Sequence, residues 1–435
     1  MSNNLILLQA VLQVMRDARR SQPDLERLVH KRLKKVLVNA YLHVPYYHEL
    51  MQDMDYDPRH DYRGPGDLSR WPITTNKDVK ERGTAAFVKE GTDLSRCSWS
   101  ATSGTTGAPL ALYCSPRESA VRYAKVLRMF LINGYSVGDT LMHITNLTKP
   151  PRSSIIQRLG IFRRIGASPR LSPERMVDLF LDYQPDVLWG ARTLLDLMAL
   201  ELMRRGIQPK PLKLVIGGAE VIGASSRRLC QEVFGTEMRE IYGATETGLI
   251  AYETPAHDGL HLCEDLVYFE FLDEHGESVP PGKPGRVVLT DLMGDVMPFI
   301  RYDLRDWAVF EQDSFESNGR RRITRIVGRD SDAVQLPDGT WRSFHSFTDI
   351  MRDYDQIVQF RVVQKTRALF HILVVADPSY LLRVEEEMRQ QLQAGFPNTV
   401  DIEIIPVDRL EPDPSGKLRL LVSEVKTIDR EDEGS

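Results

Sequence analysis

Four short stretches of this 435-residue chain gather residue types that could bind phosphate groups and a metal ion. The first, Ser100–Pro109, places hydroxyls and glycines in one loop after an expected strand. Glycines let the backbone approach a ligand closely, and consecutive N–H and O–H donors can surround phosphate oxygens. The loop lacks the G-x-x-x-x-G-K-[ST] pattern of a Walker A motif. Considered alone, such a loop is more often a surface turn.

The other three stretches supply an aromatic ring, carboxylates and a lysine. In Glu240–Gly248 a tyrosine could stack on a flat base and a glutamate could hold Mg²⁺ near phosphates. In Ile300–Asp306 a carboxylate could accept hydrogen bonds from ribose hydroxyls, with a surface Asp–Arg pair as the alternative. In Asp413–Arg419 a lysine beside a glycine could bind phosphate or carboxylate oxygens. Each stretch is weak evidence alone, and their order and spacing carry the argument.

The apolar patterns predict the elements that must position these residues. One N-terminal helix is expected over Arg27–Leu50, ended or kinked by Pro45. From Ser98 onward, short apolar runs alternate with amphipathic segments, which indicates a layered α/β domain with a mostly parallel sheet. The expected strands are 141–145, 187–189, 212–216 and 238–241, and the expected helices are 173–183 and 194–205.

The pattern changes twice more toward the C-terminus. Residues 259–327 hold short β-rich stretches separated by Gly, Pro and Asp, which predicts a small β-subdomain. Residues 328–332 are polar and form a candidate hinge. The remainder combines one helix pattern with β-rich runs, so we predict domains over 1–327 and 333–435, joined by the hinge.

Composition and charge exclude several classes of protein. Lys and Arg total 56 against 61 Asp and Glu, a net charge of −5, which argues against a generally basic nucleic-acid binder. The four cysteines form no C-x-x-C pair, so no disulfide framework is expected. No apolar run approaches the roughly 18–20 residues that span a bilayer, and the N-terminus lacks a signal-peptide pattern. We therefore expect a soluble, cytoplasmic protein without a membrane or nucleic-acid partner.

Taken together in this order, the motifs resemble the adenylate-forming superfamily of acyl-CoA synthetases, and most closely its phenylacetate–CoA ligase-like branch. The resemblance implies an α/β fold: a large N-terminal adenylate-forming domain, layered α/β with a small β-subdomain, and a small mobile α+β C-terminal domain. It rests on DLSRWPITTNK, TSGTTGAP, VIGGAE, YGATETG, DGLHLCEDLVYFEF, PGRVVLTDL, IRYDLRD, IVGRDSD and SGKLR.

The resemblance also implies a role for individual residues. The Ser/Thr/Gly loop would hold the β- and γ-phosphates of ATP, and a Gly-Gly-Ala-Glu segment would line the adenine and acyl pockets. Within the Y-G-x-T-E motif, the tyrosine would stack near adenine, the threonine would meet the α-phosphate and the glutamate would bind Mg²⁺. An aspartate would bind the ribose, an arginine would reach ribose or phosphate, and a lysine would bridge the substrate carboxylate and the α-phosphate. The Ser/Thr/Gly loop is Thr102, Ser103, Gly104, Thr105, Thr106 and Gly107, and the Gly-Gly-Ala-Glu segment is Gly217, Gly218, Ala219 and Glu220. The Y-G-x-T-E residues are Tyr242, Gly243, Thr245 and Glu246. The aspartate is Asp306, the arginine is Arg329 and the lysine is Lys417.

The implied reaction uses ATP and Mg²⁺ to convert a carboxylic acid, aromatic or arylacetic, into an acyl-AMP with release of pyrophosphate. CoA is the expected acceptor of the acyl group. The protein's task is to align the reacting atoms and neutralise charge at the α-phosphate. Because relatives are often dimers, the resemblance leaves a homodimer open.

The sequence departs from the family pattern at three places. Ala108 stands where the phosphate loop usually has lysine, and the hinge reads Gly328-Arg329-Asp330-Ser331-Asp332 instead of G-R-x-D-D. Phenylacetate–CoA ligases carry a G-x-N-x-F-P loop after the hinge, whereas Asp338–His345 keeps only the glycine. Two alternatives therefore stay open: an adenylating enzyme that passes the acyl group to a carrier-protein thiol or an amine, and a non-catalytic nucleotide-binding protein.

Three further groups of residues are weaker candidates. His257, His261 and Cys263 lie where some relatives bind structural zinc, but their spacing is not a standard zinc signature. His143 could line the acyl pocket, although a structural histidine is the simpler expectation. Arg320–Arg322 could contact the 3′-phosphate of CoA, with a solvated hairpin face as the alternative.

Overall fold

A computed structural model describes residues 3–101, 110–145, 162–312, 320–329, 333–343, 347, 350–351, 354, 356–412 and 418–425. The chain forms two compact units. Unit 1 comprises Met1–Gly134 with Ile241–Val327, and unit 2 comprises Tyr135–Glu240 with Gly328–Ser435. The predicted functional domains 1–327 and 333–435 stay a prediction, although a unit boundary also falls at the start of the predicted hinge.

Unit 1 begins with helices, and one of them breaks where the sequence predicts. Val44 takes an extended conformation (φ −114°) between α2 and α3, because the ring of Pro45 disfavours a helical residue before it. Helix α5 starts with a capping box in which Ser115 and Glu118 satisfy each other's backbone N–H groups. The helices are α1 (Asn3–Asp17), α2 (Gln22–His43), α3 (Pro45–Asp53), α4 (Asn76–Arg82) and α5 (Pro116–Ile132), with 3₁₀ turns at Pro65–Arg70, Thr84–Phe87 and Leu94–Arg96.

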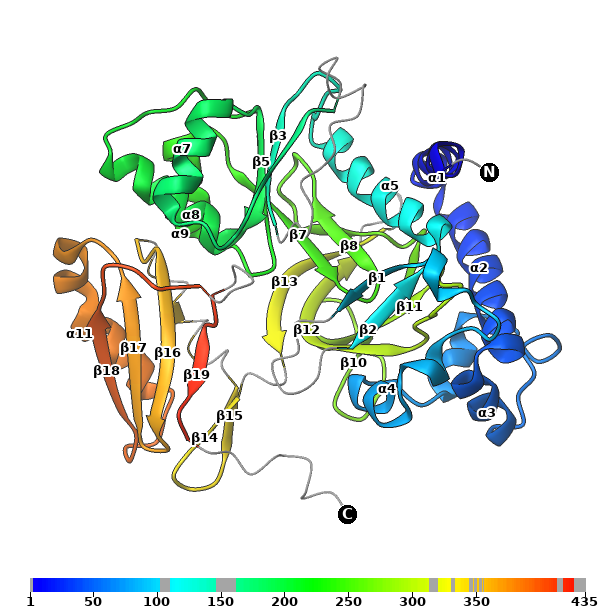
Figure 1. The fold of residues 1–435 in the computed structure, drawn as a ribbon. Helices are drawn as coiled ribbons and strands as arrows, with labels where there is room; N and C mark the ends of the chain where they lie inside the picture. The colour runs from blue at the N-terminus through cyan, green and yellow to red at the C-terminus, as the bar shows by residue number, and fades with distance from the viewer. Residues whose placement is uncertain are drawn as a thin grey trace. The chain divides into compact units, whose positions relative to one another are not determined.

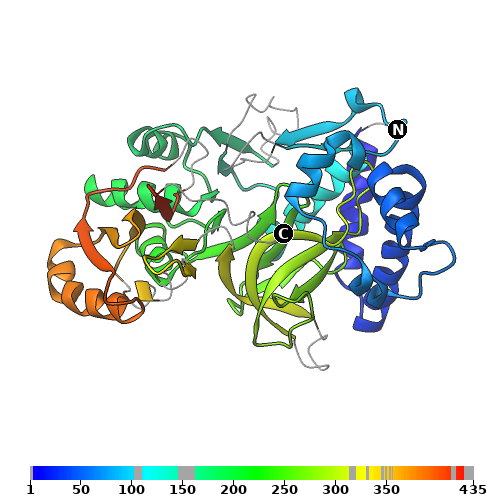
Figure 2. The same ribbon diagram turned by 90° about the horizontal axis from the view of Figure 1, so that it is seen from below.

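The main sheet of unit 1 has the order β10-β11-β12-β13-β9-β8-β7, and strands β10–β13 curve strongly in Figure 2. The pairs β10–β11, β11–β12, β13–β9, β9–β8 and β8–β7 are antiparallel. Its strands are β7 (Met238–Ala244, which starts in unit 2), β8 (Gly248–Glu253), β9 (Leu260–Leu262), β10 (Val267–Leu272), β11 (Pro284–Asp291), β12 (Tyr302–Gln312) and β13 (Arg321–Arg329). A separate hairpin joins β1 (Ser98–Ala101) and β2 (Ala111–Cys114).

Unit 2 contains the predicted parallel sheet, in the order β4-β3-β5-β6-β7, of which Figure 1 labels β3, β5 and β7. All four predicted strands and both predicted helices are confirmed, with ends shifted by up to three residues. The elements are β3 (Leu141–Ile144), β4 (Arg164–Ala167), β5 (Val187–Ala191), β6 (Leu214–Gly218), α7 (Pro173–Tyr183), α8 (Arg192–Arg204) and α9 (Ala224–Phe234).

The C-terminal part of unit 2 has the predicted α+β composition. Its sheet has the order β18-β17-β16-β19, and α11 lies beside it (Figure 1). Leu381, Met388 and Leu392 of α11 belong to the buried cluster that the sheet strands also form. The elements are β14 (Ala333–Gln335), β15 (Trp341–Ser343), β16 (Gln359–Thr366), β17 (Leu369–Val375), α11 (Pro378–Ala394), β18 (Asp401–Pro406) and β19 (Leu421–Ser423). None of the helices in the described ranges is long and apolar enough to cross a bilayer.

Candidate active site

The Y-G-A-T-E-T-G motif forms the end of β7, a tight turn and the start of β8. Ala244 pairs with Gly248, so Thr245, Glu246 and Thr247 form a three-residue turn. Gly248 has a φ of +74°, which favours glycine, and a Cβ on Gly243 would lie 3.0 Å from the Gly248 carbonyl oxygen. Both glycines therefore close the turn. Thr245 is exposed and Glu246 is half-buried at its tip.

Two tyrosine–carboxylate hydrogen bonds connect this motif to β12. Tyr242 Oη donates to Asp306 Oδ2 at 2.6 Å, and both residues are buried. Tyr302 Oη donates to Glu246 Oε1 at 3.1 Å. Burial, with the nearby Glu246 charge, raises the pKa of Tyr302, so its hydroxyl stays protonated and can orient the carboxylate. The fold thus brings together motif residues that are about sixty positions apart in the sequence.

The rest of the I-R-Y-D-L-R-D motif is structural. Arg301 is buried, pairs with Glu270 at 3.1 Å and donates to the carbonyl oxygens of Ser69 and Trp71. Asp303 Oδ1 accepts from the Arg305 backbone N–H at 2.7 Å. The alternative of a surface Asp–Arg pair is wrong, because Asp303 and Asp306 are both buried.

The Gly-Gly-Ala-Glu segment lies in unit 2, where β6 ends. Ala219 has a φ of +67°, and a Cβ on Gly217 would collide with the side chains of Met238 and Ile222. Glu220 Oε2 accepts from Thr193 Oγ1 at 2.6 Å and lies 3.2 Å from Arg192, while Oε1 accepts from the Leu418 backbone N–H at 2.5 Å. The Glu220 carboxylate is therefore held inside the protein. A role for this segment in lining a nucleotide or acyl pocket stays a prediction.

Several predicted site residues lie outside the described residues. They are the phosphate-loop residues Thr102, Ser103, Gly104, Thr105, Thr106 and Gly107, and the lysine Lys417. Gly328 and Arg329 form the last two residues of β13, and Asp330–Asp332 of the predicted hinge are outside the description. The roles assigned to these residues stay predictions.

Comparison with known proteins agrees with the geometry. Residues 97–292 match the family model described as AMP-binding enzyme, and residues 337–424 match the CapK C-terminal domain. Phenylacetate-coenzyme A ligase of Aromatoleum evansii is 28% identical over 72% of both chains, and that of Thermus thermophilus is 28% identical over 72% of this chain and 74% of its own.

A solved structure supports the fold over nearly the whole chain. The crystal structure of 2-hydroxyisobutyryl-CoA ligase in the postadenylation state matches with a TM-score of 0.75 at 18% identity, over 93% of this chain and 90% of that one. The chain belongs to the AMP-binding, adenylate-forming superfamily. It is an enzyme of the AMP-forming acid–CoA ligase family, which favours catalysis over the non-catalytic alternative.

For this family the residues at the turn fit a magnesium ion bound with ATP. Mg²⁺ typically takes one or two carboxylates together with substrate phosphates and water. Glu246 supplies a half-buried carboxylate whose orientation is fixed by Tyr302, and the exposed Thr245 adds a hydroxyl beside it. Glu246 would therefore hold the ion, which would offset triphosphate charge.

The histidines and arginines named above as weaker candidates make structural contacts. Within the described ranges no group of three or more His, Cys, Asp and Glu side chains could hold a metal, and His261 Nε2 pairs with Asp258 at 2.8 Å. His143 stacks on Trp189 at 3.8 Å between ring centroids and contacts Arg164; its burial beside that cation lowers its pKa to about 3. Arg320–Arg322 are half-buried and Arg321 pairs with Glu264 at 2.7 Å, so this run is only partly solvated. Its contact with CoA stays a prediction.

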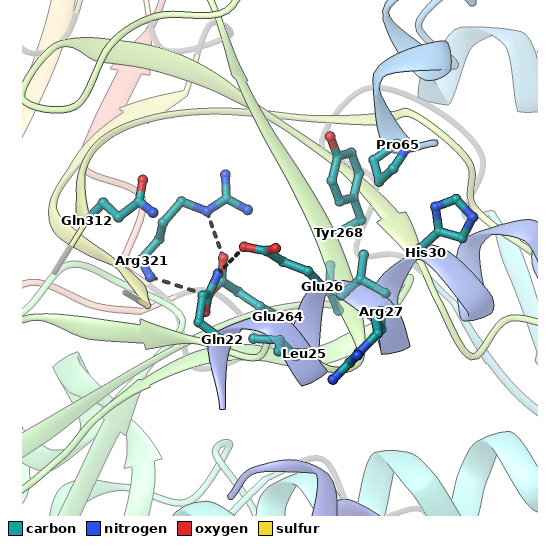
Figure 3. A pocket seen from close by; sticks show the side chains of 12 residues that line it. Gln22, Leu25, Glu26, Arg27, His30, Pro65, Glu264, Tyr268, Gln312 and Arg321 are labelled. Carbon is teal, nitrogen blue, oxygen red and sulfur yellow. Dashed lines mark hydrogen bonds and ion pairs between the residues drawn. The ribbon is translucent and has the colours of Figure 1, made fainter. Parts of the chain in front are cut away.

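A cavity of about 780 Å³ lies in unit 1 between the start of α2 and strands β10 and β13 (Figure 3). It is lined by Gln22, Glu26, His30, Tyr268 and Arg321 among others, and Figure 3 shows Arg321 turned toward Glu264. None of the predicted site residues lines it. The cavity is therefore distinct from the cluster at the β7–β8 turn and β12.

Sequence reasoning missed two residues that contact the turn directly. Arg122 and Lys125 on α5 donate hydrogen bonds to its backbone carbonyl oxygens. The helix pattern could not reveal this, because basic residues on an amphipathic helix are usually solvated.

Proposed function

We propose that this enzyme activates an aromatic or arylacetic acid with ATP and Mg²⁺ and transfers the acyl group to CoA. The observation that carries the proposal is the pair of hydrogen bonds Tyr242–Asp306 and Glu246–Tyr302, which brings the predicted adenine, ribose and magnesium residues into one cluster. The substrate class is supported by the curated phenylacetate–CoA ligases, at 27–29% identity.

In the first step a substrate carboxylate oxygen attacks the α-phosphorus of ATP. The new oxygen–phosphorus bond replaces the bond to the β-phosphate, and pyrophosphate leaves. In the second step the sulfur of CoA attacks the acyl carbon, the carbon–oxygen bond to AMP breaks, and the thiol proton is released. No residue of the protein forms a covalent bond in this scheme, so its contribution is alignment and charge stabilisation.

Each motif has a distinct part in the first step. The Asp306 carboxylate accepts hydrogen bonds from the ribose hydroxyls, and the Tyr242 hydroxyl donates to the same carboxylate. Thr245 contacts the α-phosphate. Lys417 brings a cation to the substrate carboxylate and α-phosphate, and the loop Thr102–Gly107 surrounds the β- and γ-phosphates. Arg329 reaches ribose or phosphate. These roles follow from the family resemblance and are consistent with the cluster at the turn.

A second candidate changes only the acceptor. The stretch Asp338–His345 keeps one glycine of the loop that phenylacetate–CoA ligases carry after the hinge, and Gly339 has a φ of +84°. In this candidate the acyl-AMP reacts with a carrier-protein thiol or an amine. A cytoplasmic location and a homodimer belong to the proposal in either case.

The test is pyrophosphate release from ATP and Mg²⁺ with aryl, arylacetic and aliphatic acids, each with and without CoA. Turnover that requires CoA, with acyl-CoA detected, supports the ligase. Acid-dependent release that CoA does not accelerate supports the second candidate. If none of the acids causes pyrophosphate release, the proposed substrate class is contradicted.

The lysine has its own test within this assay. Lys417→Ala should slow acid-dependent pyrophosphate release by about 10²–10³-fold, the usual loss for one preorganised charged group. Unchanged release would show that Lys417 does not stabilise the transition state.

A further inference from the structure

Helix α5 carries a row of charged side chains at helical spacing, and most of that row is buried. Glu118, Arg122, Lys125 and Arg128 follow one another at intervals of four, three and three residues, so they share one face of the helix. Lys125 and Arg128 are each 2% exposed. Burying two cations is unfavourable unless each has strong partners, so the partners indicate what each cation does.

The two central cations bind the Y-G-A-T-E-T-G turn. Lys125 Nζ donates to the Thr247 carbonyl oxygen at 2.7 Å. Arg122 donates through one nitrogen to the Thr245 carbonyl oxygen at 3.1 Å and through another to the Glu246 carbonyl oxygen. All three backbone carbonyls of the three-residue turn therefore accept hydrogen bonds from α5.

Arg128 has a different partner one helical turn further on. It forms a buried ion pair with Asp265 at 2.8 Å, and the backbone oxygen of Asp265 also accepts from Arg32. This part of the row joins α5 to the β9–β10 connection. Arg128 is therefore a matched control: a buried cation on the same face whose described hydrogen bonds do not reach the turn.

The bonds from α5 fix the orientation of the turn's peptide groups. While the carbonyls bond to α5, the Glu246 carboxylate accepts from Tyr302 and Thr245 stays exposed. The aliphatic stem of Arg122 also packs at the turn's end, since a Cβ on Gly248 would lie 3.5 Å from Arg122 Cγ. The cations thus restrict the residues that the proposed function assigns to Mg²⁺ and the α-phosphate.

We propose that Arg122 and Lys125 are positioning residues that hold Thr245 and Glu246 in place for magnesium-bound ATP. This inference rests on the proposed nucleotide site and adds two residues to it. Residues that orient a metal-binding residue without contacting the metal typically contribute 10–100-fold to metal affinity or activity.

The experiment measures the affinity of the full-length chain for ATP by calorimetry, with Mg²⁺ and with EDTA. Lys125→Met and Arg122→Met should each weaken binding of ATP in Mg²⁺ by about tenfold or more, and affect binding in EDTA much less, because Glu246 acts through the metal. Arg122→Lys, which keeps a charged donor, should recover part of the loss. Arg122 is half-buried, so its variants test the inference if Lys125→Met does not fold.

Arg128→Gln separates positioning from general stability. It should lower the melting temperature and leave the affinity for ATP in Mg²⁺ within about twofold. Equal losses in Arg128→Gln and Lys125→Met, or unchanged affinity in both turn variants, would overturn the inference. A wild-type chain that binds ATP in Mg²⁺ but adenylates no acid contradicts the proposed function alone, whereas one that does not bind ATP contradicts both.

Discussion

At the scale of single residues, the cluster at the β7–β8 turn shows that one motif residue can orient another. The sequence predicts a role for Tyr242 beside adenine and for Asp306 on ribose, and it treats these roles as independent. The structure connects them through a 2.6 Å hydrogen bond. A buried carboxylate with a short hydroxyl partner is held in one orientation, which the proposed contact of Asp306 with ribose requires.

Tyr242→Phe tests this connection, because it keeps the ring and removes only the hydroxyl. We expect the KM for ATP to rise about tenfold or more, since a hydrogen bond to a charged group contributes roughly 1.5–3 kcal/mol. Steady-state kinetics at saturating acid measure the effect. Tyr135→Phe is the control, because the Tyr135 hydroxyl donates to the Asp139 carbonyl in unit 2. An unchanged KM for ATP would show that the hydroxyl is not needed to position Asp306.

The protonation of His143 gives a pH prediction at the same scale. Its pKa falls from the usual 6.5 to about 3 in the folded chain, first because of burial and then because of Arg164. Below pH 6.5 the unfolded chain binds a proton that the folded chain does not, so stability is lost as the pH falls toward 3.

We therefore expect wild type to lose about 2 kcal/mol more unfolding free energy between pH 7 and pH 5 than His143→Phe does. The phenyl ring should keep the stacking on Trp189. Urea unfolding at a series of pH values measures the difference, and the two stability curves should run parallel above pH 7. Parallel curves below pH 6 as well would mean that His143 titrates normally in the folded chain.

At the scale of elements, periodicity predicts much of unit 2 because its strands and helices have simple environments. Pro173–Tyr183 begins at a proline after a serine cap and shows one apolar face, and the helix has those bounds. The core strands are continuous apolar runs, typical of a parallel sheet covered on both faces. What the sequence could not show is the partner of each polar residue. The sequence suggests that Lys125 and Arg128 face solvent. In the structure both are buried, because their partners come from the distant β7–β8 turn and β9–β10 connection.

The packing at the end of β6 gives the prediction for this scale. A Cβ on Gly217 would collide with Met238 and come within 2.7 Å of Ile222 Cδ1, so Gly217→Ala forces these side chains to move. Overpacking of this kind costs about 1–3 kcal/mol, measured as the free energy of unfolding in urea. Gly138→Ala is the matched control, because no atom lies within 4 Å of its added Cβ. Equal stability of the two variants would mean that β6 relaxes without strain.

At the scale of the whole molecule, Glu220 joins parts of unit 2 that are far apart in the chain. Its carboxylate, 4% exposed, binds the start of α8 through Thr193 and Arg192. The same carboxylate accepts the backbone N–H of Leu418, which directly follows the predicted lysine in the sequence. The family resemblance predicts a C-terminal domain that swings between the two half-reactions, so a bond at this position can favour one of them.

Glu220→Gln should therefore affect the two half-reactions unequally. Adenylation, measured by ATP–pyrophosphate exchange, should slow by about tenfold or more, because small misplacements of a reacting group have large effects on rate. Transfer from added acyl-AMP to CoA should change little, since the role proposed for Lys417 belongs to adenylation. Glu201→Gln is the control: this carboxylate is also buried in unit 2, and it pairs with Arg204 and Arg205 at the C-terminal end of its own helix. If both half-reactions slow equally in Glu220→Gln, the carboxylate supports the fold of unit 2 and has no separate part in adenylation.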